Sequence, residues 1–173
     1  MKLLKLISPC LLLLFVFTVV ASAQKKPVRK TPAKPPATVV PPLDVRAARE
    51  KVDVQLSNVN DFVDKLAAIA QGLEVADTDA KAGNLKPATV AKIEAKKKEI
   101  VEAIRNIKTG LSTLESEFRT KPVLQKYLPT IQGITDLAAQ SEDSAIAGKF
   151  VAAKDPLRDI AKKLTDTLAV LPK

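Results

Sequence analysis

Apolar residues recur at intervals of seven along the region that follows residue 42. The first series consists of Val45, Val52, Val59, Leu66 and Leu73. Three further apolar residues each fall four positions after a member of that series: Leu56, Val63 and Ala70. Alternating steps of four and three place all of these side chains on one face of an α-helix. We therefore predict a long amphipathic helix over about residues 43–75.

A second long series follows the same arithmetic. Its members are Ile93, Ile100, Ile107 and Leu114, with Ile104, Leu111 and Phe118 between them or after them. Pro87 suits the first turn of a helix because that turn needs no amide donor, and Gly83–Asn84 suits the turn before it. The predicted second helix has about 32 residues and runs roughly 48 Å at 1.5 Å per residue.

The C-terminal third is more interrupted. Leu124, Ile131 and Ala138 share the seven-residue interval, but Pro129 lies among them, so we expect a short turn over 122–128 and then a helix over about 129–146. Gly148 marks a chain reversal.

The last apolar series is Phe150, Leu157, Leu164 and Leu171. Asp155–Pro156 has the pattern of a helix N-cap followed by proline, so we expect the last helix to begin or bend there. No segment has the alternation of a β-hairpin. The predicted fold class is all-α, an antiparallel four-helix bundle over residues 43–173.

The first 23 residues have the organisation of a signal peptide. Lys2 and Lys5 precede an apolar run from Leu11 to Val20, and small residues follow at 21–23. This pattern predicts cleavage after Ala23. The apolar run is well short of the roughly 20 residues that a membrane span needs. We expect a periplasmic or secreted protein without a transmembrane span after processing.

Residues 24–42 form a proline-rich basic segment, which we expect to be a disordered linker. Its charged residues are Lys25, Lys26, Arg29, Lys30 and Lys34, with no acidic residue among them. The chain carries a formal net charge of +9; the two signal lysines supply two of these charges and the linker five, so residues 43–173 carry about +2. The linker is a candidate electrostatic tether to an anionic envelope surface, and a solvated spacer is the alternative.

The composition excludes much site chemistry. The chain has no His and no Trp, and its single Cys (Cys10) and Met (Met1) lie in the predicted signal peptide. Imidazole catalysis, thiol nucleophiles and the usual haem or zinc ligands are therefore missing from the mature chain. We predict no catalytic residue, no cofactor and no metal site, and too few aromatic residues remain to stack nucleic-acid bases.

Three charged motifs have simple structural interpretations. Residues 77–83 open like a calcium loop but lack the ligands at its fifth and twelfth positions, so we expect a solvated interhelix loop. In Lys96–Lys98, adjacent lysines point in different directions; we expect Lys97 to lie along the apolar face with its ammonium in water, and Glu94 to pair with Lys98. The carboxylate pairs Asp61/Asp64 and Asp155/Asp159 lie among polar helix positions, where solvated carboxylates have little catalytic use.

These observations favour a non-catalytic, exported bundle that acts as an envelope-associated interaction or scaffold module, with the basic linker as its tether. Its partner would be an anionic envelope surface or an envelope protein, and not nucleic acid. A different hypothesis is a carrier or holdase for lipid or other apolar ligands, in which the amphipathic helices open. A third is self-association, because a seven-residue seam also pairs separate chains.

Overall fold

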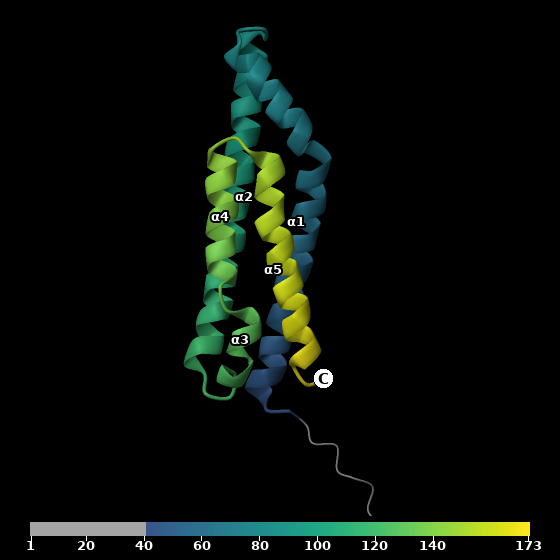
Figure 1. The fold of residues 1–173 in the computed structure, drawn as a ribbon, viewed down its shortest axis with the longest axis vertical. Coiled ribbons are helices and arrows are strands. Elements are labelled where there is room, and N and C mark those ends of the chain that lie inside the picture. Colours follow the sequence, from purple (N-terminus) through teal and green to yellow (C-terminus); the bar gives the residue numbers. More distant parts are fainter. Residues whose placement is uncertain (1–40) are drawn as a thin grey trace, which may run out of the picture. The chain divides into compact units, whose positions relative to one another are not determined.

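The computed structural model describes residues 41–173, which fold as an antiparallel four-helix bundle (Figure 1). The four long helices in this part of the chain are α1 (Leu43–Lys81), α2 (Pro87–Thr120), α4 (Ile134–Ile146) and α5 (Phe150–Val170). A 3₁₀ turn, η1 (Gln125–Tyr127), and one turn of helix, α3 (Leu128–Ile131), connect α2 to α4. The predicted all-α fold class is confirmed.

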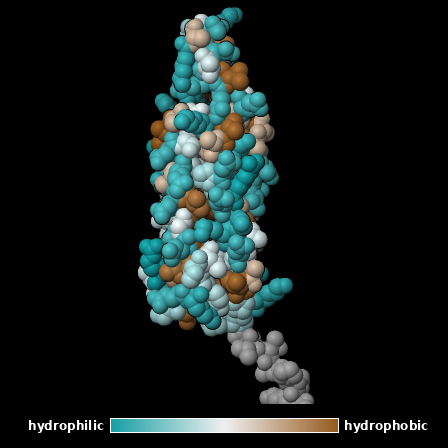
Figure 2. Space-filling view, viewed as in Figure 1, coloured by the Kyte–Doolittle hydropathy of each residue, from teal (hydrophilic) through white to brown (hydrophobic). Residues whose placement is uncertain are grey.

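The predicted apolar faces form the core, and hydrophilic residues make up most of the face of the molecule seen in Figure 2. All five members of the first seven-residue series are at most 9% exposed, and Ile100, Ile104 and Leu111 of the second helix are at most 4% exposed. Around this core α1 packs beside α5 and α2, while α4 packs between α2 and α5. None of the helices within residues 41–173 combines the length and the apolarity that crossing a bilayer requires.

Two glycines lie at the chain reversals that the sequence predicts, although α1 continues to Lys81, beyond its predicted end at about residue 75. Gly83 (φ 77°) and Gly148 (φ 74°) adopt the left-handed conformation that residues with a Cβ rarely take. After α1 the amide of Asn84 donates to the carbonyl of Asp79, and after α4 the amide of Lys149 donates to that of Ser144. Both bonds belong to the Schellman motif, which satisfies the last carbonyls of a helix. Pro87 is in the first turn of α2, as expected.

The third predicted helix is wrong in one respect. Instead of one helix over 129–146, the structure has α3 and α4 separated at Gly133, whose φ is 88°. Figure 1 shows α3 lying at an angle to α4 at the lower end of the bundle. Ile131 in α3 and Ile134 in α4, on either side of this break, are both completely buried.

The last helix does not begin at Asp155–Pro156, which was one of the two alternatives that the sequence left open. α5 begins at Phe150, so Asp155 lies inside the helix and pairs with Arg158, while Pro156 occupies an interior position. Proline has no amide to donate to the carbonyl of Ala152, but Ala152 is exposed and water can serve that carbonyl. Burial of Phe150 and Ala153, both 0% exposed, outweighs the lost hydrogen bond.

The two long N-terminal helices continue beyond the other two. In Figure 1 the upper parts of α1 and α2, with the loop over 82–86, extend past the loop that joins α4 to α5. α1 bends toward α2 in this region. The bundle therefore has a two-helix hairpin at one end, while its opposite end, where α1 starts and α2 and α5 finish, is built from several segments.

Candidate functional site

The predicted tether residues lie outside the part of the chain that the structure describes. These are Lys25, Lys26, Arg29, Lys30 and Lys34, and the predicted signal peptide over 1–23 lies outside it as well. Of the predicted linker only Pro41 and Pro42 are described. The geometry of the bundle must therefore be assessed on its own charged and apolar surfaces.

Helix α1 holds both ends of α5 through two side chains of opposite charge. The carboxylate of Glu74 accepts a hydrogen bond from the amide of Val151 at 2.7 Å, in the first turn of α5. At the other end, Arg49 Nη1 donates to the carbonyls of Leu168 and Leu171, each at 2.7 Å. A negative group at the N-terminus and a positive group at the C-terminus both stabilise the helix dipole. The two contacts fix the register of α5 against α1.

Helix α2 caps α4 in a similar way through Glu115. Its carboxylate accepts hydrogen bonds from the amides of Gly133 (3.0 Å) and Thr135 (3.1 Å) and from the Thr135 hydroxyl (2.8 Å). Arg119 pairs with the same carboxylate. Burial alone would raise the pKa of Glu115, but these hydrogen bonds, led by that from Gly133, outweigh it and lower the pKa. The side chain of Glu115 supplies the cap that the residues flanking α4 lack.

A second buried carboxylate, Glu142, joins α4 to α2 further along. Lys108 Nζ and Arg105 Nε both donate to it, the latter at 2.6 Å. These two hydrogen bonds, that from Lys108 first, lower the pKa of Glu142. Because an unpaired charge in this position would carry a large desolvation penalty, the two cations are needed to keep the buried carboxylate ionised.

The third buried carboxylate lies where the α1–α2 hairpin leaves the bundle. Asp77 is 5% exposed and accepts hydrogen bonds from Lys81 and Lys97, each at 2.7 Å. These bonds, Lys81 first, lower the pKa of Asp77. Asp77 Oδ2 also lies against Gly148, where a Cβ would approach it to 3.5 Å. The pair Asp77–Lys97 therefore joins α1 to α2 directly above the α4–α5 loop.

This arrangement corrects two predictions about charged motifs. Residues 77–81 are helical and Asp77 is buried, so this part of the motif is not a solvated loop. Lys97 does not leave its ammonium in water, because it pairs with Asp77 and with Glu94 (2.9 Å), and Glu94 thus contacts Lys97 instead of Lys98. The apolar face brings Lys97 close enough to the bundle to neutralise a buried charge.

The remaining charged motifs are on the surface. Lys96 pairs with Glu99 on the outside of α2, and Lys98 is exposed. Asp61, Asp64, Asp155 and Asp159 are all exposed, as predicted. Within residues 41–173 no three acidic or other metal-binding side chains come close enough to hold a metal ion.

The buried polar groups of the bundle are committed to structural contacts. Every buried side-chain nitrogen or oxygen atom in the described residues has a hydrogen-bond partner. The carboxyl pKa values of Asp77, Glu115 and Glu142 are lowered, so all three are ionised at neutral pH and hold no proton to donate. Their chemistry is that of fixed negative charges that join helices.

Two open grooves follow the seam between α1 and α2. The larger, about 530 Å³, is lined by Ala47, Glu50, Lys51, Val54, Gln55, Gly110, Thr113, Leu114 and Glu117. A smaller groove of about 240 Å³ lies further along the same seam, beside Phe62, Ile69 and Ala103. Lys51 pairs with Glu117 across the larger groove. Along these grooves α1 and α2 do not pack closely, and the Lys51–Glu117 ion pair joins them at the surface.

The sequence carries a signal for the three buried carboxylates. Asp77, Glu115 and Glu142 each lie four residues after a buried apolar residue, namely Leu73, Leu111 and Ala138. A carboxylate in an apolar series is expected to be buried and so to need a cation or amide partner. The sequence does not indicate which helix supplies that partner.

No protein family model, curated protein or solved structure matches the chain.

Proposed function

We propose that the protein is an exported, non-catalytic scaffold or interaction module of the cell envelope, attached to an anionic envelope surface by its basic linker. The attachment uses the five positive charges over residues 25–34, which no acidic residue offsets. Several charges acting together on an anionic surface give additive attraction that salt weakens. The bundle then presents its surface to a partner at a fixed location.

The observation that carries this proposal is the clamping of α4 and α5 by the long helices. Glu74 and Arg49 hold both ends of α5, and Glu115 caps α4. A scaffold benefits from helices whose register is fixed by such contacts. Each contact involves a charged group, and hydrogen bonds to charged groups contribute about 1.5–3 kcal/mol.

The same contacts argue against the carrier or holdase hypothesis. Opening the bundle along the α1–α5 seam would separate both clamps and expose the core series to water. Opening along the α2–α4 seam would strip Glu142 of Lys108 and Arg105. A carrier that opens in normal use would need two helices whose separation requires less free energy.

Attachment can be tested with the chain starting at Gln24, the form expected after signal cleavage. In one variant all five linker cations (Lys25, Lys26, Arg29, Lys30 and Lys34) are changed to Gln. In the matched control the same number of exposed bundle lysines is changed to Gln: Lys65, Lys86, Lys92, Lys98 and Lys162, none of which forms an ion pair within the described residues. Binding to an isolated bacterial envelope fraction is measured as the salt concentration rises.

We expect the linker variant to dissociate at a much lower salt concentration than the wild type, and the control to remain near the wild type. Equal weakening by both variants would mean that net charge matters and the linker does not, which overturns the tether. An apolar dye tests the carrier hypothesis in the same preparations. Strong dye binding by the wild type, or lipid that copurifies with it, would favour the carrier over the scaffold.

A further inference from the structure

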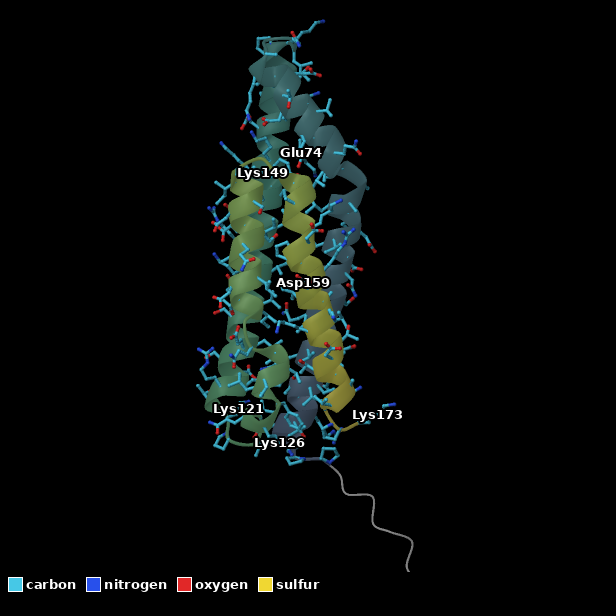
Figure 3. The ribbon with its side chains drawn as sticks, in the orientation of Figure 1. Glu74, Lys121, Lys126, Lys149, Asp159 and Lys173 are labelled. Atoms are coloured by element: carbon cyan, nitrogen blue, oxygen red, sulfur yellow. The ribbon has the colours of Figure 1, made fainter. Side chains whose placement is uncertain are left out.

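One end of the bundle combines exposed apolar groups with positive charge. We call it the basal surface and define it as residues 41–46, 119–127 and 170–173, where α1 begins and α2 and α5 end. Figure 3 shows Lys121, Lys126 and Lys173 at this end, opposite the α1–α2 hairpin. These three stretches are distant in sequence, and the bundle topology brings them together.

The apolar part of the basal surface is a shallow hollow of about 470 Å³. Its lining is Pro41, Pro42, Val45, Pro122, Val123, Lys126, Tyr127 and Pro172. Val123 in this lining is 41% exposed, and Leu43, which follows Pro42, is 80% exposed. Leu43 is more exposed than any other large apolar residue of the described part. An exposed apolar group at the end of a bundle contributes nothing to the core.

The charge of the basal surface differs from that of the rest of the bundle. It contains five basic residues (Arg46, Arg119, Lys121, Lys126 and Lys173) and one acidic residue, Asp44. The other described residues contain 16 basic and 18 acidic side chains. The basal surface thus has a formal charge of +4 on a bundle of only +2. Lys121 pairs with Asp44 and Glu117, and Arg119 pairs with Glu115, so the basic residues of this surface that form no ion pair within the described residues are Arg46, Lys126 and Lys173. Its neighbour in sequence is the linker, which adds five more positive charges.

The chemistry of these groups matches the interface of a lipid bilayer. Apolar side chains gain free energy by entering the boundary between headgroups and acyl chains, and flanking lysines bind anionic headgroups while their stems cover apolar surface. Tyr127 is half-buried, and Lys126 Nζ lies 4.8 Å from the centre of its ring. Tyrosine prefers this boundary because one side of its ring is apolar and its hydroxyl is wet. A soluble acidic polymer would use the lysines but would leave Leu43 and Val123 in water.

We propose that the basal surface docks on an anionic lipid bilayer and holds the bundle with its α1–α2 hairpin pointing away from the membrane. This inference rests on the proposed envelope attachment and adds a second contact, made by the folded bundle itself, to that of the linker. Leu43 and Val123 enter the headgroup region, and Lys126 and Lys173 contact the lipid phosphates, while Lys121 pairs with Asp44 and Glu117. The two contacts reinforce each other because the linker joins the bundle at this surface.

The first experiment uses tryptophan as a reporter, since the chain has no native Trp. Leu43→Trp places the reporter on the basal surface, and Ala82→Trp places a matched one in the loop of the hairpin, where Ala82 is exposed. Each protein, from Gln24 onward, is mixed with phosphatidylglycerol vesicles and with phosphatidylcholine vesicles. We expect the emission of Leu43→Trp to move to shorter wavelength only with the anionic vesicles, and that of Ala82→Trp to stay unchanged. An unchanged emission of both, or a shift of both, overturns the orientation.

The second experiment measures vesicle affinity. The double variant Lys126→Gln/Lys173→Gln is expected to bind phosphatidylglycerol vesicles more weakly by roughly 25-fold, about fivefold for each lysine near the surface. The matched pair Lys86→Gln/Lys92→Gln, at the hairpin end, should change affinity by less than about twofold because it lies beyond the Debye length. Leu43→Ser/Val123→Ser should also weaken binding, with an unchanged thermal unfolding curve. Equal effects of the two lysine pairs would overturn the proposal.

The linker variant separates failure of this inference from failure of the tether. If removing the linker charges weakens vesicle binding while Leu43→Trp never shifts, the linker binds and basal docking is wrong. If Leu43→Trp still shifts at low salt after those charges are removed, the basal surface binds by itself. Binding that depends on charge alone and occurs equally on a soluble anionic polymer would also exclude docking on a bilayer.

Discussion

The two sides of helix α1 are built differently. On one side α1 contacts α5, 69 or more residues away along the chain, and holds both of its ends through Arg49 and Glu74. On the other side α1 faces its own neighbour in sequence, α2, across two grooves, and Lys51–Glu117 bridges them at the surface. A short connecting loop therefore does not make two helices the most closely packed pair. α1 packs most closely against α5, where its apolar face and the side chains that hold the ends of α5 lie on the same side.

The two seams of α1 also differ in how much they contribute to stability and in how far their residues are exposed to solvent. The α1–α5 seam contributes to the core, whereas the α1–α2 seam keeps Val54 56% exposed and Gln55 resting on Gly110. Substitutions on the two sides of the same helix should therefore have unequal effects on the free energy of unfolding.

The largest effect is expected in the core beside α1. Leu157→Ala on α5 removes a side chain that is 0% exposed and should lower the free energy of unfolding by about 2–5 kcal/mol. Val54→Ala on the groove side should change it by less than about 0.5 kcal/mol. Urea unfolding followed by circular dichroism measures both. Similar losses for the two variants would mean that the α1–α2 groove closes in solution.

The next comparison uses two cations that are two residues apart on α1. Arg49→Gln removes the donor to the α5 carbonyls and should lower the free energy of unfolding by about 1–3 kcal/mol. Lys51→Gln removes an exposed partner of Glu117 and should cost at most about 1 kcal/mol. The same unfolding experiment at low and high salt checks the assignment. A larger loss for Lys51→Gln would contradict the proposed difference between the seams.

Acid should weaken the contacts made by the buried carboxylates. The pKa values of Asp77 and Glu142 are lowered in the folded state from ordinary values of 3.8 and 4.5, by Lys81 and Lys97 and by Lys108 and Arg105 respectively. Below those ordinary values the unfolded chain binds more protons than the folded one, so stability present at neutral pH decreases as the pH falls through the lowered pKa values. We expect a steep loss below about pH 4.5.

Asp77→Asn tests the origin of this acid sensitivity. It should reduce stability at pH 7, by about 1–3 kcal/mol, and flatten the pH dependence below about pH 4. Asp61→Asn, at an exposed position of the same helix, is the control and should leave the profile unchanged. Thermal unfolding over a pH series distinguishes the two. Parallel curves for wild type and Asp77→Asn would show that this carboxylate does not contribute.

The smallest effect concerns two helical glycines. A Cβ on Gly72 of α1 meets nothing within 4 Å, so Gly72→Ala should stabilise the protein by about 0.5–1 kcal/mol through helix propensity. A Cβ on Gly110 of α2 would lie 2.9 Å from Gln55 Nε2, so Gly110→Ala gains less because Gln55 must move. Melting temperatures give the order. A greater gain at Gly110 would show that Gln55 does not rest on α2.

The periodicity of apolar residues was sufficient to predict the main helices. Steps of three and four determine which side chains share a face, and this local geometry does not depend on the partner helix. α1 and α2 begin at Leu43 and Pro87, where proline and the apolar series predicted their starts, and Gly83 and Gly148 lie at the predicted chain reversals. The all-α bundle follows because four amphipathic faces can be buried only against one another.

Tertiary packing decided the remaining features. The break at Gly133 and the start of α5 at Phe150 are not indicated by the local signals at Pro129 and Asp155, and the early start of α5 buries Phe150 completely. The partners of Asp77, Glu115 and Glu142 come from other turns or helices, so only the packed bundle determines them. The basal surface likewise exists only in the fold, because Leu43, Val123 and Lys173 meet through the antiparallel course of the chain. The physical reason is the same in each case. Burial and charge pairing depend on distances between residues in space, whereas sequence periodicity specifies only the helix face that carries a side chain.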